Sequence, residues 1–221
     1  MRNYSLLIKK HLIDFMRIKI SFILLLALLC CGNDKIVGEE ISNDLDINKN
    51  IVSVIDFGIK NDGSPIGSEI NDLVRNSYSK TLFFPAGTYN LTEPIILPVD
   101  YTKNVNIIFD KNALIKCDHH LEALLKVGFS EQRIMDYNLR RFSYIEGGVF
   151  DCYNADNGII VNGFKQLVQL RSMSLVRGRK THIRIARYGD FSWTTSSDTK
   201  IDNVTIHGLG SNDDIIGIYI D

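Results

Sequence analysis

Five basic residues lie close together in the last quarter of the chain, where they could bind an acidic ligand. They are Arg177, Arg179, Lys180, Arg184 and Arg187. Guanidinium groups bind carboxylates through paired hydrogen bonds, and an ammonium group adds a second kind of cationic donor. The segment therefore predicts either a site for an acidic ligand or a solvated charged face of the fold. The net charge of −1 for the whole chain argues against nucleic acid as a partner.

Aromatic residues follow in the polar segment Tyr188–Ser197, with Trp193 near its middle. Aromatic side chains of a loop either stack against a bound sugar ring or bury their area against the fold, and the sequence leaves both open. The neighbouring residues His119 and His120 predict no metal site, because adjacent residues of a strand point to opposite faces.

Short apolar segments separated by polar breaks make up most of the chain after Pro98, and no long helical pattern competes with them. Such a series predicts an all-β fold, either a sandwich or a solenoid. The expected strands are Val105–Phe109, Ala113–Cys117, Phe142–Ile145, Gly158–Val161, Leu167–Val176, His182–Ala186, Asn203–His207 and Ile216–Ile220.

A repeated spacing favours the solenoid. Ile159 and Ile183 are 24 residues apart, a plausible length for one coil, and Ile183 and Ile218 are 35 residues apart. If the segment Tyr188–Ser197 loops out, the longer interval is explained. We therefore expect these three isoleucines to occupy matching positions in consecutive coils.

Alternate residues in these strands should point into the coil or away from it. The inward residues are expected to stack as aliphatic ladders, and the outward residues to face solvent on one sheet. The inward residues are Ile159, Val161, Ile183, Ile185, Ile218 and Ile220, and the outward residues are Asn162, His182, Arg184, Tyr219 and Asp221.

The block Val54–Pro98 has an ordered series of elements that could cover the first coil of a solenoid. A strand ending at Asp56–Gly58 and a polar turn at Asn61–Gly63 precede a predicted helix. The helix has Ser68 as its expected N-cap and presents one apolar stripe, and an apolar strand at Leu82–Phe84 follows it. The stripe consists of Ile70, Leu73, Val74 and Ser77, and a turn over Pro85–Tyr89 comes after the strand.

The order of these elements resembles the opening of the pectate lyase superfamily, which includes polygalacturonases, rhamnogalacturonan-degrading enzymes and phage tailspikes. The resemblance implies a right-handed parallel β-helix with an N-terminal capping helix. It also implies a protein that processes polysaccharides, as a lyase or glycoside hydrolase of uronic-acid-rich glycans. The alternatives are a non-catalytic β-helix for glycan binding or adhesion, and an inactive fragment. Because the sequence ends at Asp221 inside an apolar segment, we expect the solenoid to be truncated there.

Asp213 and Asp214 are similar to the acid pair that precedes an apolar strand in polygalacturonases. Such hydrolases use one carboxylic acid to protonate the leaving oxygen and a carboxylate to activate water. The third acid of that pattern is missing, because Thr181–Ile183 occupies its place. The two aspartates are therefore the catalytic candidates, with a polar turn between strands as the alternative interpretation.

A lyase would instead need a cation that neutralises the uronate carboxylate and a basic side chain that removes the neighbouring proton. Calcium is the cofactor expected in that case, and no other cofactor is indicated. In this superfamily one sheet face forms the saccharide groove. The resemblance therefore makes Arg184, Trp193 and Tyr219 the predicted substrate-binding residues.

The N-terminal segment predicts export. Basic residues precede the apolar run Phe22–Cys31, which is ten residues long. A membrane-spanning helix needs about 20 apolar residues, so the run fits a signal peptide better. Its end resembles the lipobox of bacterial lipoproteins, which makes Cys31, or alternatively Cys30, the predicted lipidation site. We therefore expect a lipoprotein of the cell envelope or outer membrane, in contact with the membrane through its lipid.

The chain should thus have three parts: a signal peptide over 1–31, a flexible linker over 32–50 and a β-helix domain over 51–221. Within the domain, we expect residues 51–98 to form the N-terminal cap and residues 99–221 the coils. Two cysteines remain after removal of the signal peptide, Cys117 and Cys152. An exported protein could join them, but both lie in strand-like segments, and we expect two buried thiols. The sequence leaves the oligomeric state open.

Overall fold

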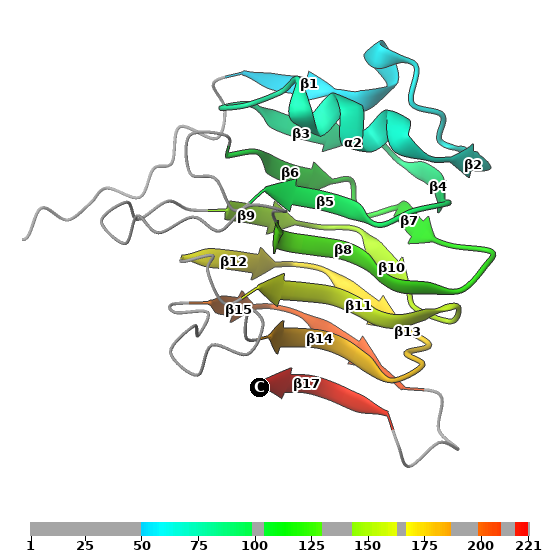
Figure 1. Ribbon diagram of the computed structural model, residues 1–221, viewed down its shortest axis with the longest axis vertical. Helices are drawn as coiled ribbons and strands as arrows, with labels where there is room; N and C mark the ends of the chain where they lie inside the picture. The colour runs from blue at the N-terminus through cyan, green and yellow to red at the C-terminus, as the bar shows by residue number, and fades with distance from the viewer. Residues whose placement is uncertain are drawn as a thin grey trace, which may run out of the picture. The chain divides into compact units, whose positions relative to one another are not determined.

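The computed structural model describes residues 50–98, 104–129, 143–162, 167–186, 199–208 and 215–220. Three sheets of parallel strands make up most of these residues, and their arrangement is consistent with a parallel β-solenoid (Figure 1). The sequence prediction of an all-β fold built from stacked coils is confirmed at this level.

We name the sheets A, B and C, in the order in which the chain passes through them. Sheet A consists of β1 (Ile51–Ser53), β3 (Thr81–Phe84), β6 (Asn106–Phe109), β9 (Ser143–Glu146), β12 (Val168–Arg171) and β15 (Lys200–Asp202). Sheet B consists of β2 (Asp62–Ile66), β4 (Gly87–Leu91), β7 (Ala113–Lys116), β10 (Val149–Asp151), β13 (Ser174–Val176) and β16 (Thr205–His207). Sheet C consists of β5 (Ile95–Pro98), β8 (Leu121–Phe129), β11 (Ala155–Asn162), β14 (Thr181–Ala186) and β17 (Ile216–Ile220).

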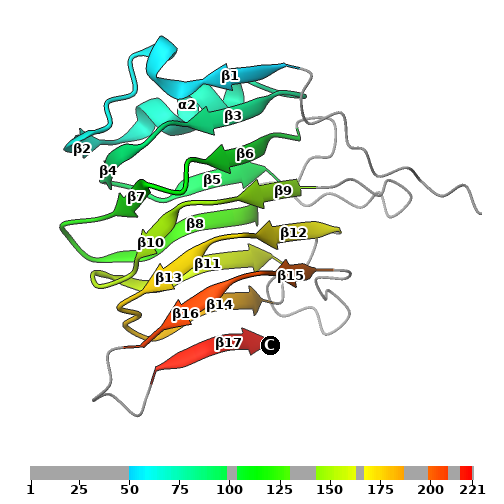
Figure 2. The ribbon, with the colours of Figure 1, turned by 180° about the vertical axis from the view of Figure 1, so that it is seen from behind.

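Successive coils stack so that each strand pairs in parallel with the strand one coil earlier and one coil later. A view from behind shows the strands of sheets A and B following one another in chain order (Figure 2). Parallel pairing of this kind places residues of consecutive coils at about 4.8 Å from one another. A side chain that repeats at the same position therefore forms a row across the sheet.

The first coil has a helix where the later coils have a strand of sheet C. After β1 the chain forms a short 3-10 helix, η1 (Val54–Phe57), then β2 and the helix α2 (Ser68–Arg75), which packs against β5. The predicted strand ending at Asp56–Gly58 is wrong, because η1 occupies most of that segment. The predicted polar turn at Asn61–Gly63 is also wrong in part, because β2 begins at Asp62.

The helix α2 buries the apolar stripe that its sequence predicts. Ile70, Leu73 and Val74 belong to the hydrophobic core of the described residues. The predicted N-cap is wrong by one residue: Gly67 is the N-cap, and its N–H donates to the Glu69 carboxylate at 2.7 Å. A glutamate in the first turn is favourable there, because the free N–H groups of a helix start attract negative charge.

Asn71 joins this helix to the edge of sheet C. Its amide oxygen accepts a hydrogen bond from the backbone N–H of Ile96 in β5 at 2.8 Å. Its amide nitrogen donates to the Glu93 carboxylate at 2.8 Å and to the carbonyl of Pro94 at 2.9 Å. Asn71 is itself buried, and its side chain satisfies a backbone group that would otherwise lack a partner at this edge.

Aromatic rings fill the interior where sheet A turns into sheet B. Phe109 lies 4.6 Å from Phe84 and 5.3 Å from Phe150 between ring centroids, and Phe84 lies 5.2 Å from Tyr89. Phe84 and Phe109 are register partners in β3 and β6, so their rings stack from one coil to the next. The next coil has Gly147 and Gly148 at this corner, and a side chain on either would collide with Phe109.

The expected strands agree with the structure in most places. The prediction of one strand over Leu167–Val176 is wrong. The segment forms two strands, β12 and β13, and Ser172 between them has a φ of 51°. The longest strand, β8, was not expected at all. Five shorter strands were also not expected as such: β2, β5, β10 and β15, and the strand β4 in the segment expected to be a turn.

The predicted register of the three isoleucines is confirmed. Ile183 pairs with Ile159 in the preceding coil and with Ile218 in the following coil. Burial decreases along this row: Ile159 and Ile183 are 0% exposed and Ile218 is 44% exposed. The difference arises because β17 is an edge strand of sheet C in the described residues. Within the described residues, no helix has the length and apolar character that crossing a membrane requires.

Candidate functional site

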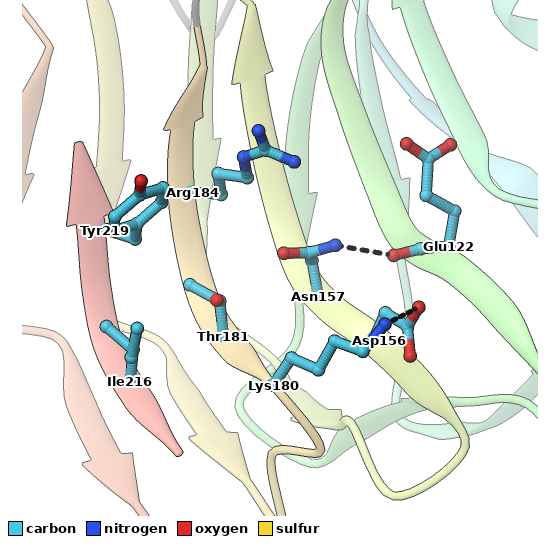
Figure 3. Close-up of a pocket in the computed structure, with 8 residues that line it drawn as sticks. All are labelled: Glu122, Asp156, Asn157, Lys180, Thr181, Arg184, Ile216 and Tyr219. Atoms are coloured by element: carbon cyan, nitrogen blue, oxygen red, sulfur yellow. Dashed lines mark hydrogen bonds and ion pairs between the residues drawn. The ribbon is translucent and has the colours of Figure 1, made fainter. Parts of the chain in front are cut away.

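A groove of about 460 Å³ lies on the outer face of sheet C, across the strands β8, β11, β14 and β17 (Figure 3). Polar and charged side chains predominate in it, with one tyrosine and one isoleucine. The lining residues are Glu122, Asp156, Asn157, Lys180, Thr181, Arg184, Ile216 and Tyr219.

The coil register brings these residues together from distant parts of the sequence. Asn157 pairs with Ala123 in β8 and with Thr181 in β14, so Asp156 lies between Glu122 and Lys180 in one row. Figure 3 shows these three side chains on the same face. The side chain of Asn157 donates to the backbone carbonyl of Glu122 at 2.9 Å, which ties two neighbouring coils at the floor of the groove.

A second row of the groove contains Arg184 and Tyr219. They are register partners in β14 and β17, and the guanidinium carbon lies 6.0 Å from the centre of the tyrosine ring. Tyr219 is 43% exposed. The sequence placed both residues on one outward face, and the structure places both in the groove. Their contact with a substrate remains a prediction.

The two acids of the groove have cationic partners. Lys126 donates to the Glu122 carboxylate at 2.7 Å, and Lys180 donates to the Asp156 carboxylate at 2.8 Å. Desolvation raises the pKa of Asp156, but contacts with Lys180 and His120 outweigh it and hold the pKa below its usual value. Asp156 is therefore ionised at neutral pH.

Two of the residues expected to face solvent are buried. Asn162 is 3% exposed and His182 is 1% exposed, so the prediction is wrong for both. Thr181 and Arg184 both line the groove although they are three residues apart, so the strict alternation of β14 breaks between them. His182 lies at the break.

His182 points into the coil. Because Asn157 pairs with Thr181 and Ile159 pairs with Ile183, His182 lies opposite Gly158. A Cβ on Gly158 would contact the sulfur of Cys152 and the side chain of Leu175, which both belong to the hydrophobic core. The imidazole Nε2 of His182 accepts a hydrogen bond from the N–H of Gly178 at 3.1 Å. Burial lowers the pKa of this histidine. His182 therefore belongs to the interior and does not belong to the groove.

The thiols Cys117 and Cys152 are free and buried, as expected. They lie at the ends of β7 and β10, which are paired strands of neighbouring coils. Burial raises the pKa of the Cys117 thiol to about 11 and that of the Cys152 thiol to about 12. Both are therefore protonated at neutral pH, and neither has the thiolate character of a nucleophile.

Several predicted site residues lie outside the described residues. They are the catalytic candidates Asp213 and Asp214, the predicted substrate-binding residue Trp193, the outward residue Asp221, the basic residue Arg187 and the lipidation candidates Cys30 and Cys31.

Sequence reasoning missed the acidic part of the groove. The prediction did not include Glu122 and Asp156, although each lies next to an apolar segment of the kind that forms strands. The signal that would have found them is the register itself. Counting back from Lys180 by one coil leads to Asp156, and by a further coil to Glu122.

Calcium was expected if the protein is a lyase. Calcium is bound by six to eight oxygen ligands, several of them carboxylates. No group of three or more His, Cys, Asp and Glu side chains suited to a metal ion occurs among the described residues. The donor set of the groove therefore does not fit a calcium ion. Comparison with protein-family models, with curated proteins and with solved structures returned no match.

Proposed function

We propose that this protein is an exported, lipid-anchored right-handed β-helix, related to the pectate lyase superfamily, that binds and processes uronic-acid-rich polysaccharides in the groove of sheet C. The observation that carries the proposal is the groove itself. It combines an exposed tyrosine, a neighbouring arginine and a row of charged side chains on the outer face of a parallel sheet. Sugar rings stack on aromatic faces, and their acid groups pair with guanidinium groups.

The charge of the groove supports an acidic ligand. Four cations and two carboxylates lie in or beside it among the described residues, which gives a formal charge of +2 with histidine neutral. The whole chain has a net charge of −1. The positive charge is thus local, and a local field of this sign raises the concentration of anions at the surface. The cations are Lys126, Arg179, Lys180 and Arg184, and the carboxylates are Glu122 and Asp156.

Between the two chemistries, the groove favours a lyase. Hydrolysis requires a carboxylic acid that is protonated before the bond breaks. Asp156 does not meet this requirement, because its pKa is lowered. A lyase requires a cation beside the uronate carboxylate and a basic group near the adjacent proton. Lys180 and Arg184 line the groove and supply the cationic part of that requirement. The base is not assigned.

A non-catalytic glycan-binding or adhesion β-helix is the second candidate. The same groove would serve it, because stacking and charge pairing suffice for binding. The pairing of both groove acids with lysines favours this alternative, since these acids then maintain the charged surface.

A panel of acidic and neutral polysaccharides tests the proposal with the full chain. Binding is measured by calorimetry, lyase activity by the ultraviolet absorbance of unsaturated uronates, and hydrolase activity by new reducing ends. We expect binding of polygalacturonate, and unsaturated products if the protein is a lyase. Binding without products of either kind would favour the adhesion alternative, and no binding to any member of the panel would refute the proposal.

Paired variants locate the binding surface. Tyr219→Ala and Arg184→Gln should each weaken binding of a uronate oligosaccharide by about tenfold, which is the loss of about one charge-assisted contact or one stacking contact. Arg75→Gln is the matched control, because Arg75 is an exposed arginine on α2, outside the groove. Equal losses in Arg75→Gln and Arg184→Gln would show that only overall charge matters.

The lipid anchor is tested separately. Growth of a bacterial host with a labelled fatty acid should label the protein, and Cys31→Ser should abolish the label whereas Cys30→Ser should not. The reverse pattern would assign the lipid to Cys30. If the unmodified protein takes up no label, the N-terminal segment is an ordinary export signal without a lipid.

A further inference from the structure

Asp156 contacts three basic side chains at once. Lys180 lies 2.8 Å, His120 3.1 Å and Arg179 3.5 Å from its carboxylate oxygens. The other carboxylates that form ion pairs within the described residues each contact a single cation. These one-to-one pairs are Asp72 with Arg75, Asp118 with Lys116, Glu122 with Lys126, Asp151 with Arg177, and Asp202 with Arg171.

This cluster of His120, Asp156, Arg179 and Lys180 has an excess of positive charge. One carboxylate faces two permanent cations, which leaves a formal charge of +1 with histidine neutral. The carboxylate lies deeper than its partners: the Asp156 side chain is 16% exposed, whereas the three basic side chains are 54% to 65% exposed. Uncompensated cations are therefore accessible from solvent at the edge of the groove.

The backbone holds the cluster in place. The N–H of Lys180 donates to the carbonyl of Asp156 at 3.2 Å, and the carbonyl of Lys180 accepts from the N–H of Ile216 at 2.8 Å. Lys180 is thus tied to the coil before it and the coil after it. Arg177, at the start of the same turn, has a φ of 55° and an ion pair with Asp151. The turn that presents Arg179 and Lys180 is therefore fixed at both ends.

The donors of the cluster retain capacity for a further acceptor. Within the described residues, the Asp156 Oδ1 atom has no hydrogen bond of good geometry, although His120 Nε2 and Arg179 Nε face it at ion-pair distance. A guanidinium has five N–H groups and an ammonium has three, and one carboxylate cannot accept from all of them. An incoming oxyanion can therefore bind without displacing Asp156.

We propose that His120, Arg179 and Lys180 form an oxyanion site that binds an acid group of the glycan, a carboxylate or a sulfate ester, directly and without a bridging metal ion. Asp156 acts as the positioning residue, because it holds the three side chains on one side of the groove. The inference rests on the proposed function of the groove, and it identifies the residues that would distinguish an acidic glycan from a neutral one.

The test compares two double variants of the full chain with equal change in charge. Arg179→Gln with Lys180→Gln removes two cations from the cluster. Lys60→Gln with Arg75→Gln removes two exposed cations from the first coil, neither of which lines the groove. Calorimetry in the presence of EDTA measures the binding of oligogalacturonate, of its methyl ester and of a sulfated oligosaccharide. Because all four substituted side chains are exposed, both variants should remain folded, and the loss of the Asp156 ion pairs should lower the unfolding midpoint of the cluster variant only slightly.

We expect the cluster variant to bind oligogalacturonate at least about tenfold more weakly, since charge-assisted hydrogen bonds are lost, and to bind the methyl ester unchanged. The control variant should bind both as the unmodified protein does. Comparison of oligogalacturonate with the sulfated oligosaccharide identifies the preferred acid group. Equal weakening for the acid and its methyl ester, or equal weakening in both variants, would overturn the oxyanion site while glycan binding by the groove stands.

A second probe separates the site from the groove function. Inorganic sulfate, used at concentrations too low for its general stabilising effect and compared with chloride at equal ionic strength, should raise the unfolding midpoint of the unmodified protein and of the control variant more than that of the cluster variant, because specific binding stabilises the folded state. If no glycan binds and sulfate acts as expected, the proposed function fails and the oxyanion site remains. If sulfate acts equally on all three proteins, the oxyanion site fails.

Discussion

The interior of the coils and the outer face of sheet C are built by the same strands, yet they follow different rules. Inside, register partners are alike: Phe84 stacks on Phe109, and Ile159 on Ile183. Outside, neighbouring residues of consecutive coils differ: Arg184 is the register partner of Tyr219, and Lys180 pairs with Asp156 one coil earlier. Apolar side chains that stack on one another stabilise the sheet, whereas side chains of equal charge at matching positions would repel one another.

The difference explains why the two regions can change independently. A core residue touches several others and has no alternative environment, so its size and shape are constrained. A residue on the outer face meets one neighbour on each side and solvent above it. The coils can therefore keep their structure while the outer face acquires new chemistry.

The largest effect is expected inside. Phe109→Ala should lower the free energy of unfolding by about 3–5 kcal/mol, because Phe109 contacts the rings of both Phe84 and Phe150. Denaturation in urea measures the change. Tyr219→Ala, which truncates an aromatic residue of the outer face, should cost less than about 1 kcal/mol. Similar costs for the two variants would contradict the distinction between interior and outer face.

A smaller loss is expected at the corner beside Phe109. Gly147 has a φ of 81°, and a Cβ there would collide with the backbone carbonyl of Phe109. Gly147→Ala should therefore cost about 1–3 kcal/mol through backbone strain and the movement that relieves the collision. Gly208→Ala is the control, because nothing lies within 4 Å of a Cβ at that position. Equal unfolding midpoints for the two alanine variants would show that the corner adapts.

The buried histidine predicts a loss of stability in acid. Burial lowers the pKa of His182 below its ordinary value of 6.5, so the unfolded chain binds this proton more readily than the folded chain. The stabilising contribution of neutral His182 is therefore complete above pH 6.5 and declines as the pH falls toward the lowered pKa. In the pH range where unfolding takes up one proton, the free energy of unfolding can fall by about 1.4 kcal/mol for each pH unit.

His182→Gln tests this contribution. Urea denaturation of both proteins over a series of pH values should give a shallower decline below pH 6.5 for the variant, whatever its stability at neutral pH. Parallel pH profiles would show that another group causes the acid sensitivity. His120, which is exposed and lies on the outer face, provides the comparison: His120→Gln should leave the decline in place.

The smallest effect on stability is expected for Arg184. Arg184→Gln should change the free energy of unfolding by less than about 0.5 kcal/mol, as is usual for a partly exposed position. The same variant should weaken the binding of an acidic oligosaccharide. A large loss of stability without a loss of binding would place Arg184 among the structural residues.

The sequence predicted the interior far better than the groove. Isoleucines at 24 and 35 residue intervals revealed the coil register, because one apolar residue type repeated at matching positions. The strand β8 was missed, because its segment Leu-Glu-Ala-Leu-Leu-Lys consists of residues with high helix propensity. Pairing with β5 and β11 on either side outweighs that local preference.

The groove residues could not be found by the same means. Glu122, Asp156 and Lys180 are different residue types, so no repeated side chain marks the row in the sequence as the isoleucines do. His182 was misplaced because the alternation in β14 breaks beside it, and a sequence pattern assumes that alternation continues. The interior is thus marked in the sequence by one residue type at matching positions, whereas the outer face changes its residue types from coil to coil and includes a local break in the alternation.

The hydrogen bond from Ile96 to Asn71 has a consequence for assembly. An open strand edge can template another strand, and proteins avoid this hazard by covering the edge. Because α2 lies over β5 and Asn71 occupies the N–H of Ile96, sheet C cannot recruit a strand from a second molecule at this position. The capping of sheet C therefore disfavours end-to-end stacking of coils from two molecules at this edge.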